Sequence, residues 1–205
     1  MKTLKKYLSM AGEWLFPSFC GICQSRLLTL DEAWYGLCGE CRRGIAVDRG
    51  ERCPVCGRPL ISEKGRCLSC REKAGETGSP APSFERLLPI FPYAGKYRTL
   101  LEAYKFGKSR GAARFLEEKF WEGLSLLPLG EMKNPVLVPV PPRPGKIKKT
   151  GWDQIEALAR IIKARRREPG ALPVYPCLKR LPSQSQKTLN REERRSNLRG
   201  KILCR

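Results

Sequence analysis

Apolar residues recur along this chain in short stretches that are separated by polar segments. Helical spacing near the N-terminus predicts an amphipathic helix over residues 4–15, which either packs on the segment that follows it or lies on a membrane surface. The polar residues 71–83 predict a linker or exposed loop. Beyond them, we expect a strand at 87–91, a helix from Tyr97 that ends before Gly107, and a second helix from Ala112 to about Leu126.

The next segment, residues 135–162, joins a β-branched run to an amphipathic pattern through a loop rich in Pro, Gly and Lys. Val136–Val140 predicts a buried parallel strand, and the spacing from Trp152 to Ile162 predicts a helix. A strand, a basic loop and a helix N-terminus in this order are suited to binding phosphate, because free amides and the helix dipole meet the anion. A Pro-rich stretch of this kind is also compatible with a polyproline ligand or a plain connector.

The last segment, residues 179–205, is polar and highly charged, with few apolar side chains. It predicts a basic arm or lid that carries one short helix near residues 190–197. Asn190 is a suitable N-cap for that helix, since its side chain can accept from the first free backbone N–H groups.

Eight of the ten cysteines form four Cys-x-x-Cys motifs in the first third of the chain. Each motif can grip a metal ion from a tight turn, and two motifs complete a tetrahedral four-sulfur site, so that two structural zinc sites are predicted. Glycine beside the cysteines allows the backbone to turn sharply. We expect the motifs to pair in sequence order, although crossed or nested pairing has the same spacing. The predicted ligands are Cys20, Cys23, Cys38, Cys41, Cys53, Cys56, Cys67 and Cys70.

Disulfides or redox chemistry are the alternatives to zinc. Disulfides require an oxidising compartment, but the apolar N-terminal stretch is interrupted by Ser9, Gly12 and Glu13 and lacks a cleavage site, so we expect a cytoplasmic protein. Redox proteins rarely use four such motifs. The remaining cysteines, Cys177 and Cys204, are interpreted as ordinary thiols. No run of 18 apolar residues is present, which argues against a membrane span.

The positive charge is concentrated at one end of the chain. The formal net charge is +20, and residues 143–205 hold 18 basic and 5 acidic residues, a net charge of +13. Such a density attracts polyanions, which include nucleic acid, phosphorylated sugars and acidic proteins. Single-stranded DNA is one candidate, although Trp152 and Tyr175 are the only aromatic residues after residue 143.

Taken together, the motifs resemble those of the ComF family of competence-associated proteins. The resemblance rests on the paired cysteine motifs, on YAGKYRTLLEAYKFGK (93–108), on LVPVPPRP (137–144) followed by TGWDQ (150–154), and on SQKTLNREERRSNLRG (185–200). It implies an α/β architecture with three parts: a helix and double zinc ribbon over 1–70, a linker over 71–83, and a type I phosphoribosyltransferase-like domain over 84–205. It also implies a role in DNA uptake or processing.

By the same resemblance, Pro141–Gly151 corresponds to a pyrophosphate-binding loop and Ser185–Asn197 to a flexible loop that closes over the sugar. Basic side chains on such a loop would stabilise the negative charge that develops on the departing pyrophosphate. Mg²⁺ and phosphoribosyl pyrophosphate are the implied ligands of this domain. The candidate phosphate-binding residues are Arg143, Lys146, Lys148, Lys149, Gly151, Gln154, Gln186, Lys187, Arg191, Arg194 and Arg195.

One feature of the family is missing from this sequence. Such proteins continue into an apolar strand with two adjacent acidic residues and a Thr-Thr-Gly turn, whereas this sequence stops at Arg205 and has aspartate only at positions 31, 48 and 153. We therefore expect an incomplete, inactive transferase-like domain. The alternatives are a zinc-ribbon adaptor that binds single-stranded DNA or a DNA-handling partner through its basic C-terminal third, and a plain protein–protein scaffold.

Overall fold

The computed structural model of the protein describes residues 18–75, 84–165, 170–186 and 188–204. The predicted helix over residues 4–15 lies outside the described residues. The elements follow in the order α2 (Leu30–Tyr35), α3 (Gly39–Arg43), α4 (Leu68–Gly75), α5 (Gly95–Lys105), α6 (Arg110–Leu124), the 3-10 helix η1 (Leu129–Glu131), α7 (Lys146–Thr150), α8 (Gln154–Ala164), β1 (Leu178–Arg180), α9 (Arg191–Leu198) and β2 (Ile202–Cys204).

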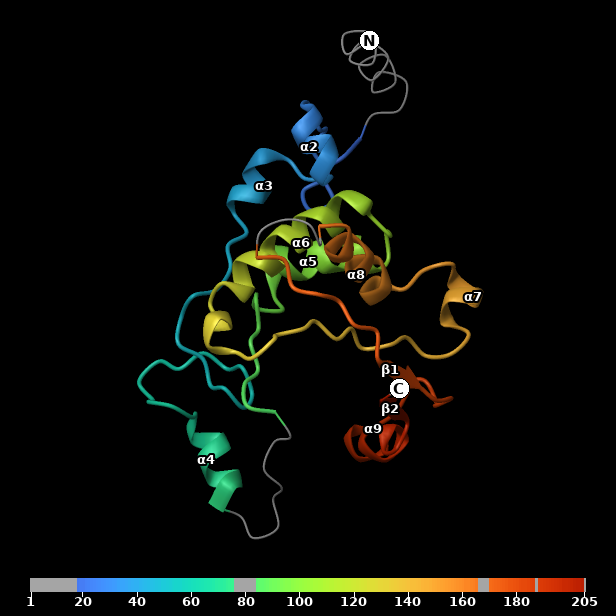
Figure 1. Ribbon diagram of the computed structural model, residues 1–205. Helices are drawn as coiled ribbons and strands as arrows, with labels where there is room; N and C mark the ends of the chain where they lie inside the picture. The colour runs from blue at the N-terminus through green and yellow to red at the C-terminus, as the bar shows by residue number, and fades with distance from the viewer. Residues whose placement is uncertain (1–17, 76–83, 166–169, 187, 205) are drawn as a thin grey trace.

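Three helices form the middle of the molecule. Helix α6 packs against both α5 and α8, and its other neighbour is α2 (Figure 1). The faces that meet there carry Leu100, Tyr104, Phe115, Leu116 and Ile162, all of which are buried. The helical spacing in the sequence predicted all three helices, because a buried apolar face repeats every three to four residues.

The first cysteine-rich ribbon shares this hydrophobic core. Cys20, Leu27, Leu37 and Ile45 belong to the same buried cluster as the apolar residues of α5 and α6. A Cβ on Gly111 of α6 would lie 2.5 Å from the backbone nitrogen of Gly36, so the ribbon and the helix touch backbone to backbone. The division into domains around residues 71–83 stays a prediction, but the core couples the first ribbon to the helices.

The second ribbon is held by the segment that was predicted as a strand at 87–91. The Leu87 amide donates to the Pro54 carbonyl over 2.7 Å, and the Asp48 amide donates to the Ile90 carbonyl over 3.1 Å. The segment is extended but belongs to no β-strand, since its hydrogen bonds go to the ribbon. The strand prediction was therefore wrong here. Residues 71–75 of the predicted linker belong to helix α4, and residues 76–83 lie outside the described part.

The predicted buried strand at Val136–Val140 is a single parallel bridge instead. Leu137 pairs with Val174, and helix α8 lies between the two segments in sequence. The bridge has the predicted parallel direction, but Val136, Val138 and Val140 are 45%, 39% and 55% exposed. Among the described residues, β1 and β2 form the one sheet, an antiparallel pair in which Lys179 faces Leu203. The phosphoribosyltransferase-like sheet thus stays a prediction.

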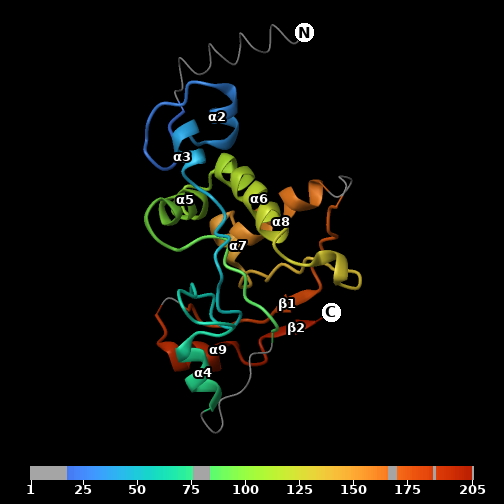
Figure 2. The same cartoon turned by 90° about the vertical axis from the view of Figure 1, so that its left-hand side faces the viewer.

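Helix α9 lies beside this strand pair, at the opposite end of the molecule from α2 (Figures 1 and 2). It begins after Asn190, whose side chain accepts hydrogen bonds from the Glu192 and Glu193 amides, while the Glu193 carboxylate accepts from the Asn190 amide. This reciprocal capping box confirms the N-cap predicted from the sequence. None of the described helices has the length and apolar character needed to cross a bilayer.

Candidate functional site

The eight cysteines of the Cys-x-x-Cys motifs gather into two groups of four. Within each group, all sulfur atoms lie within 4.8 Å of one another. The first group combines the first two motifs and the second group combines the last two, so the motifs pair in sequence order as expected. The groups are Cys20, Cys23, Cys38 and Cys41, and Cys53, Cys56, Cys67 and Cys70.

In the first group, Cys20 and Cys23 lie in a tight turn, and Cys38 and Cys41 lie at the start of the short helix α3. The Cys20 amide donates to the Ser25 carbonyl over 2.8 Å, which closes the turn, and the Cys38 thiol caps helix α3 by accepting from the Cys41 amide. Glycine at position 21 was expected to allow a sharp turn, but here it avoids a steric contact. A Cβ on Gly21 would lie 3.2 Å from the Cβ of Ala103 on α5. The turn is therefore pressed against the central helices.

The second group repeats the plan. The Cys53 amide donates to the Arg58 carbonyl over 2.9 Å, and the Gly57 amide donates back to the Cys53 carbonyl over 2.8 Å. Gly57 has a φ of 71°, in the left-handed region that favours glycine. Here the glycine does serve the turn, as the sequence suggested. The other two cysteines, Cys67 and Cys70, lie just before α4 and inside it.

Both groups fit a zinc ion. A tetrahedral ion with Zn–S bonds of about 2.3 Å places its sulfur ligands about 3.8 Å apart. The Sγ atoms of Cys23 and Cys38 are 3.6 Å apart, as are those of Cys56 and Cys67. Zinc would be held by four thiolates at each site and would supply folding free energy rather than catalysis, since no ligand position is left open.

The pKa values of four of these thiols are also shifted by their surroundings. Hydrogen bonds from Ser25 lower the pKa of Cys23 to about 6. Burial opposes ionisation of Cys53, but backbone N–H groups of its own cluster lower its pKa to about 6. Burial and the neighbouring thiols raise the pKa of Cys41 and raise that of Cys70 to about 12. A divalent cation would favour ionisation of Cys41 and Cys70, whose pKa values are raised in its absence.

Glu32 of α2 stabilises the backbone next to the first cluster through hydrogen bonds. Its carboxylate accepts hydrogen bonds from the amides of Leu28 (2.9 Å) and Gly39 (2.8 Å), the latter next to Cys38. It also closes a capping box with Thr29. These hydrogen bonds lower the pKa of Glu32, so the carboxylate stays ionised. The sequence reasoning missed this residue, although Thr-x-x-Glu before an apolar run is a capping signature.

The predicted pyrophosphate loop forms a compact turn around α7. Gly145 and Gly151 bound this helix with φ of 77° and 66°. Lys146 points inward, where its ammonium group lies 2.5 Å from an oxygen of Asp153 and 2.8 Å from the Gln154 side-chain oxygen. Lys146 and Gln154 thus already have partners inside the chain. Lys148 and Lys149 are exposed on α7, and Arg143 is half-buried before it.

Asp153 occupies the position at which the sequence predicted a bound phosphate. The buried carboxylate caps α8 by accepting from the amides of Ile155 and Glu156, each over 3.0 Å. An anion of the protein itself therefore satisfies the helix N-terminus. An aspartate directly before an amphipathic pattern is an N-cap signal that could have indicated this cap from the sequence.

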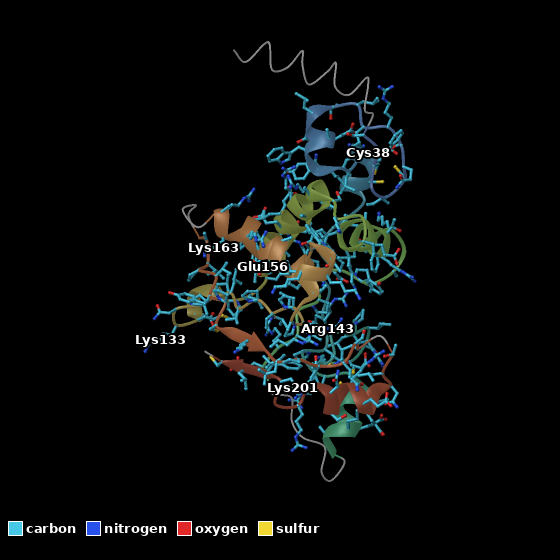
Figure 3. The ribbon with its side chains drawn as sticks, turned by 90° about the vertical axis from the view of Figure 1, so that its right-hand side faces the viewer. Cys38, Lys133, Arg143, Glu156, Lys163 and Lys201 are labelled. Atoms are coloured by element: carbon cyan, nitrogen blue, oxygen red, sulfur yellow. The ribbon has the colours of Figure 1, made fainter. Side chains whose placement is uncertain are left out.

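The arm holds the remaining candidates. Gln186 is half-buried, and its carbonyl accepts a 3.0 Å hydrogen bond from the guanidinium of Arg194. Lys187 and the side chains of Arg191 and Arg195 lie outside the described part. Across the described residues, no hydrogen bond or ion pair joins the loop at 143–154 to the arm at 185–198. Figure 3 shows Arg143 between the helices and the strand pair, with Lys201 near the strands.

Tyr104 joins α5 to the start of α8 through a hydrogen bond and a ring contact, neither of which was predicted from the sequence. The Tyr104 hydroxyl donates to the Gln154 carbonyl, and the Tyr104 ring meets that of Trp152 edge-on at 5.7 Å. Burial, aided by the charge of Asp153, raises the pKa of Tyr104 to about 12, which keeps the hydroxyl a donor. Three residues beyond the end of α5, Lys108 donates to the Thr150 carbonyl over 2.9 Å.

Comparison with known proteins agrees with the cysteine geometry. Residues 11–76 match the double zinc ribbon domain. The DNA utilization protein YhgH of Escherichia coli K12 is 27% identical over 92 residues, which are 45% of this chain and 36% of that protein. The YhgH protein of Shigella flexneri gives the same values. The chain thus matches about a third of the length of these curated relatives.

No solved structure gives a significant match to this chain. The ribbon match and the YhgH similarity support the ComF-like affiliation that the motifs predict.

Proposed function

We propose that this protein serves DNA uptake or utilization as a ComF-like protein, in which two structural zinc ribbons hold the fold and basic surfaces bind single-stranded DNA or a DNA-handling partner. The observation that carries the proposal is the pair of four-cysteine clusters in a chain similar to a protein named for DNA utilization. Thiolate clusters of this kind suit the reducing cytoplasm, where we place the protein.

The charge distribution supports nucleic acid as the partner. Residues 143–205 carry a net charge of +13. Within this segment Lys148 and Lys149 are exposed. Lysines that neutralise phosphates release condensed counterions, so affinity for single-stranded DNA falls steeply with salt.

The test is fluorescence anisotropy of a labelled single-stranded oligonucleotide at several salt concentrations. We expect the logarithm of the binding constant to fall linearly with the logarithm of salt concentration, with a slope of about −0.7 for each phosphate contacted. A salt-independent affinity, or no binding at low salt, would contradict binding of single-stranded DNA and would favour a protein partner instead.

Binding of phosphoribosyl pyrophosphate with Mg²⁺ is a second candidate. It is favoured by the parallel bridge between Leu137 and Val174 and by the glycine-bounded turn that precedes α8. The Asp153 cap and the Lys146 ion pair oppose it, because they satisfy the amides and the cation that a phosphate needs. We expect no transferase activity from this chain and no binding heat in calorimetry with this ligand; a saturable heat would restore the enzyme hypothesis.

A further inference from the structure

An aromatic pocket opens between α5, α6, the start of α8 and residues 90–93. Its volume is about 440 Å³, within the range of about 300–1,000 Å³ typical of small-molecule sites. Five of the residues that line it carry aromatic rings, namely Phe91, Tyr93, Tyr104, Phe106 and Phe120. The pocket is therefore shaped by flat apolar surfaces, to which a planar ring adapts well.

Two of these rings stand at the solvent-exposed edge of the pocket. Tyr93 is 69% exposed and Phe106 is 62% exposed, so both rings are accessible from solvent. Each carries a cation close to its ring: the Arg98 guanidinium lies 5.9 Å from the Tyr93 ring centre, and the Lys105 ammonium lies 5.4 Å from that of Phe106.

The surroundings of the pocket are positively charged. Lys105 lines it, and Lys108 binds the Thr150 carbonyl, which brings the end of α7 with its exposed lysines towards this end of α5 (Figure 2). The acidic lining residue, Glu102, is paired with Arg98 over 2.9 Å. The charge of Glu102 is therefore compensated, whereas Lys105 and Lys108 leave a surplus that is complementary to phosphate.

We propose that this pocket receives a base of a single-stranded nucleic acid, which stacks on Phe106 and Tyr93 while the adjoining phosphates lie against Lys105, Lys108 and the exposed Lys148 and Lys149 of α7. This inference rests on the proposed function and specifies the surface that performs it. Rings supply sequence-tolerant stacking and lysines follow the backbone, which is the combination found in single-strand binders. A duplex would not fit, since its bases are stacked inside the helix.

The pocket supplies what the C-terminal third of the sequence lacks. Aromatic residues are scarce after residue 143, and Tyr175 lies outside the pocket lining. The fold instead gathers aromatic residues of 91–120 in one pocket with Lys105, and Lys108 nearby donates to the Thr150 carbonyl at the end of α7. Gln154 also lines the pocket, and its side-chain oxygen accepts a hydrogen bond from Lys146.

The test compares Phe106→Ala and Tyr93→Ala with Tyr175→Ala, a control that removes another exposed ring. Each full-length, zinc-loaded variant is titrated with fluorescein-labelled oligothymidylate and with an abasic oligonucleotide of equal length. Loss of one stacking platform should weaken oligothymidylate binding by about tenfold. Affinity for the abasic strand should be unchanged, and the Tyr175 variant should match the unmodified protein.

Equal loss of affinity for both strands, or no loss for either, would overturn the stacking proposal while leaving DNA binding itself intact. Absence of binding by the unmodified protein would instead contradict the proposed function. A second variant, Leu101→Trp, fills the pocket from α5. We expect it to weaken binding of oligothymidylate more than binding of the abasic strand; binding of oligothymidylate as tight as that of the unmodified protein would show that the pocket is a packing void only.

Discussion

At the scale of single residues, Gly111 is the point at which the first ribbon meets the helices. A Cβ at this position would lie 2.5 Å from the Gly36 nitrogen and 2.7 Å from the Tyr35 oxygen. Because both neighbours are backbone atoms, neither can move away without shifting the ribbon. The contact explains why a glycine is tolerated in the first turn of α6, where another residue would favour the helix.

We expect Gly111→Ala to lower the free energy of unfolding by roughly 1–3 kcal/mol, as overpacking does, although alanine is the better helix former. The matched control is Gly130→Ala, because a Cβ there meets nothing within 4 Å. Chemical denaturation of the two variants measures the difference. Equal stability of the Gly111 and Gly130 variants would show that the ribbon does not rest on α6.

Glu32 is the second residue with a defined structural task. Its carboxylate satisfies two backbone amides on either side of the first cluster. Glu32→Ala should therefore loosen the first ribbon, because these amides lose their acceptor, and should speed zinc loss to a chelator. Glu72→Ala, at an exposed position of α4, is the control. Chelator-release rates that are the same in both variants would rule out a bracing role for Glu32.

At the scale of elements, the two zinc ribbons differ in what supports them. The first shares a core with α5 and α6, whereas the second is held by backbone hydrogen bonds to residues 87–90 and by an ion pair between Arg49 and Glu122. The second ribbon therefore depends more heavily on its metal. Structural zinc in small modules supplies on the order of 10 kcal/mol.

Replacement of both Cys53 and Cys56 by serine should release one equivalent of zinc and unfold the second ribbon, while the helices of the core remain. Native mass spectrometry measures the metal, and circular dichroism measures the helices. An unchanged zinc content in this double variant would show that the last two motifs do not form a shared site.

The basic arm is a further element with a separable role. Arg194 contacts the arm itself, through the Gln186 carbonyl. Neutralising Arg191, Arg194 and Arg195 to glutamine should weaken DNA binding and reduce its salt slope, with little effect on melting temperature. Unfolding of this triple variant would show instead that the arm supports the core.

At the scale of the whole molecule, the sequence predicted what depends on local spacing. The cysteine intervals indicated two clusters and their order, and the apolar periodicity indicated α5, α6 and α8. Contacts between distant segments were not predictable in this way. The exposure of Val138 depends on which segments cover it, and the packing of Gly111 depends on a ribbon that lies more than seventy residues earlier in the chain.

The partners of the candidate site residues were likewise not predictable from the sequence. Lys146 was predicted as a phosphate ligand because basic loops before helices bind anions, but the residue that meets both the lysine and the helix is Asp153. The aromatic pocket could not be predicted from the sequence for a related reason. Its rings come from segments that are neighbours only after folding.

We infer from the geometry of the thiols that two four-cysteine clusters hold zinc and organise the fold. The most direct test of this inference is the mass of the purified protein under native conditions, compared with its mass after denaturation in acid. We predict a native mass that exceeds the denatured mass by two zinc ions per chain, one for each cluster. A native protein that carries no zinc, or one in which these cysteines are joined as disulfides, would contradict the account.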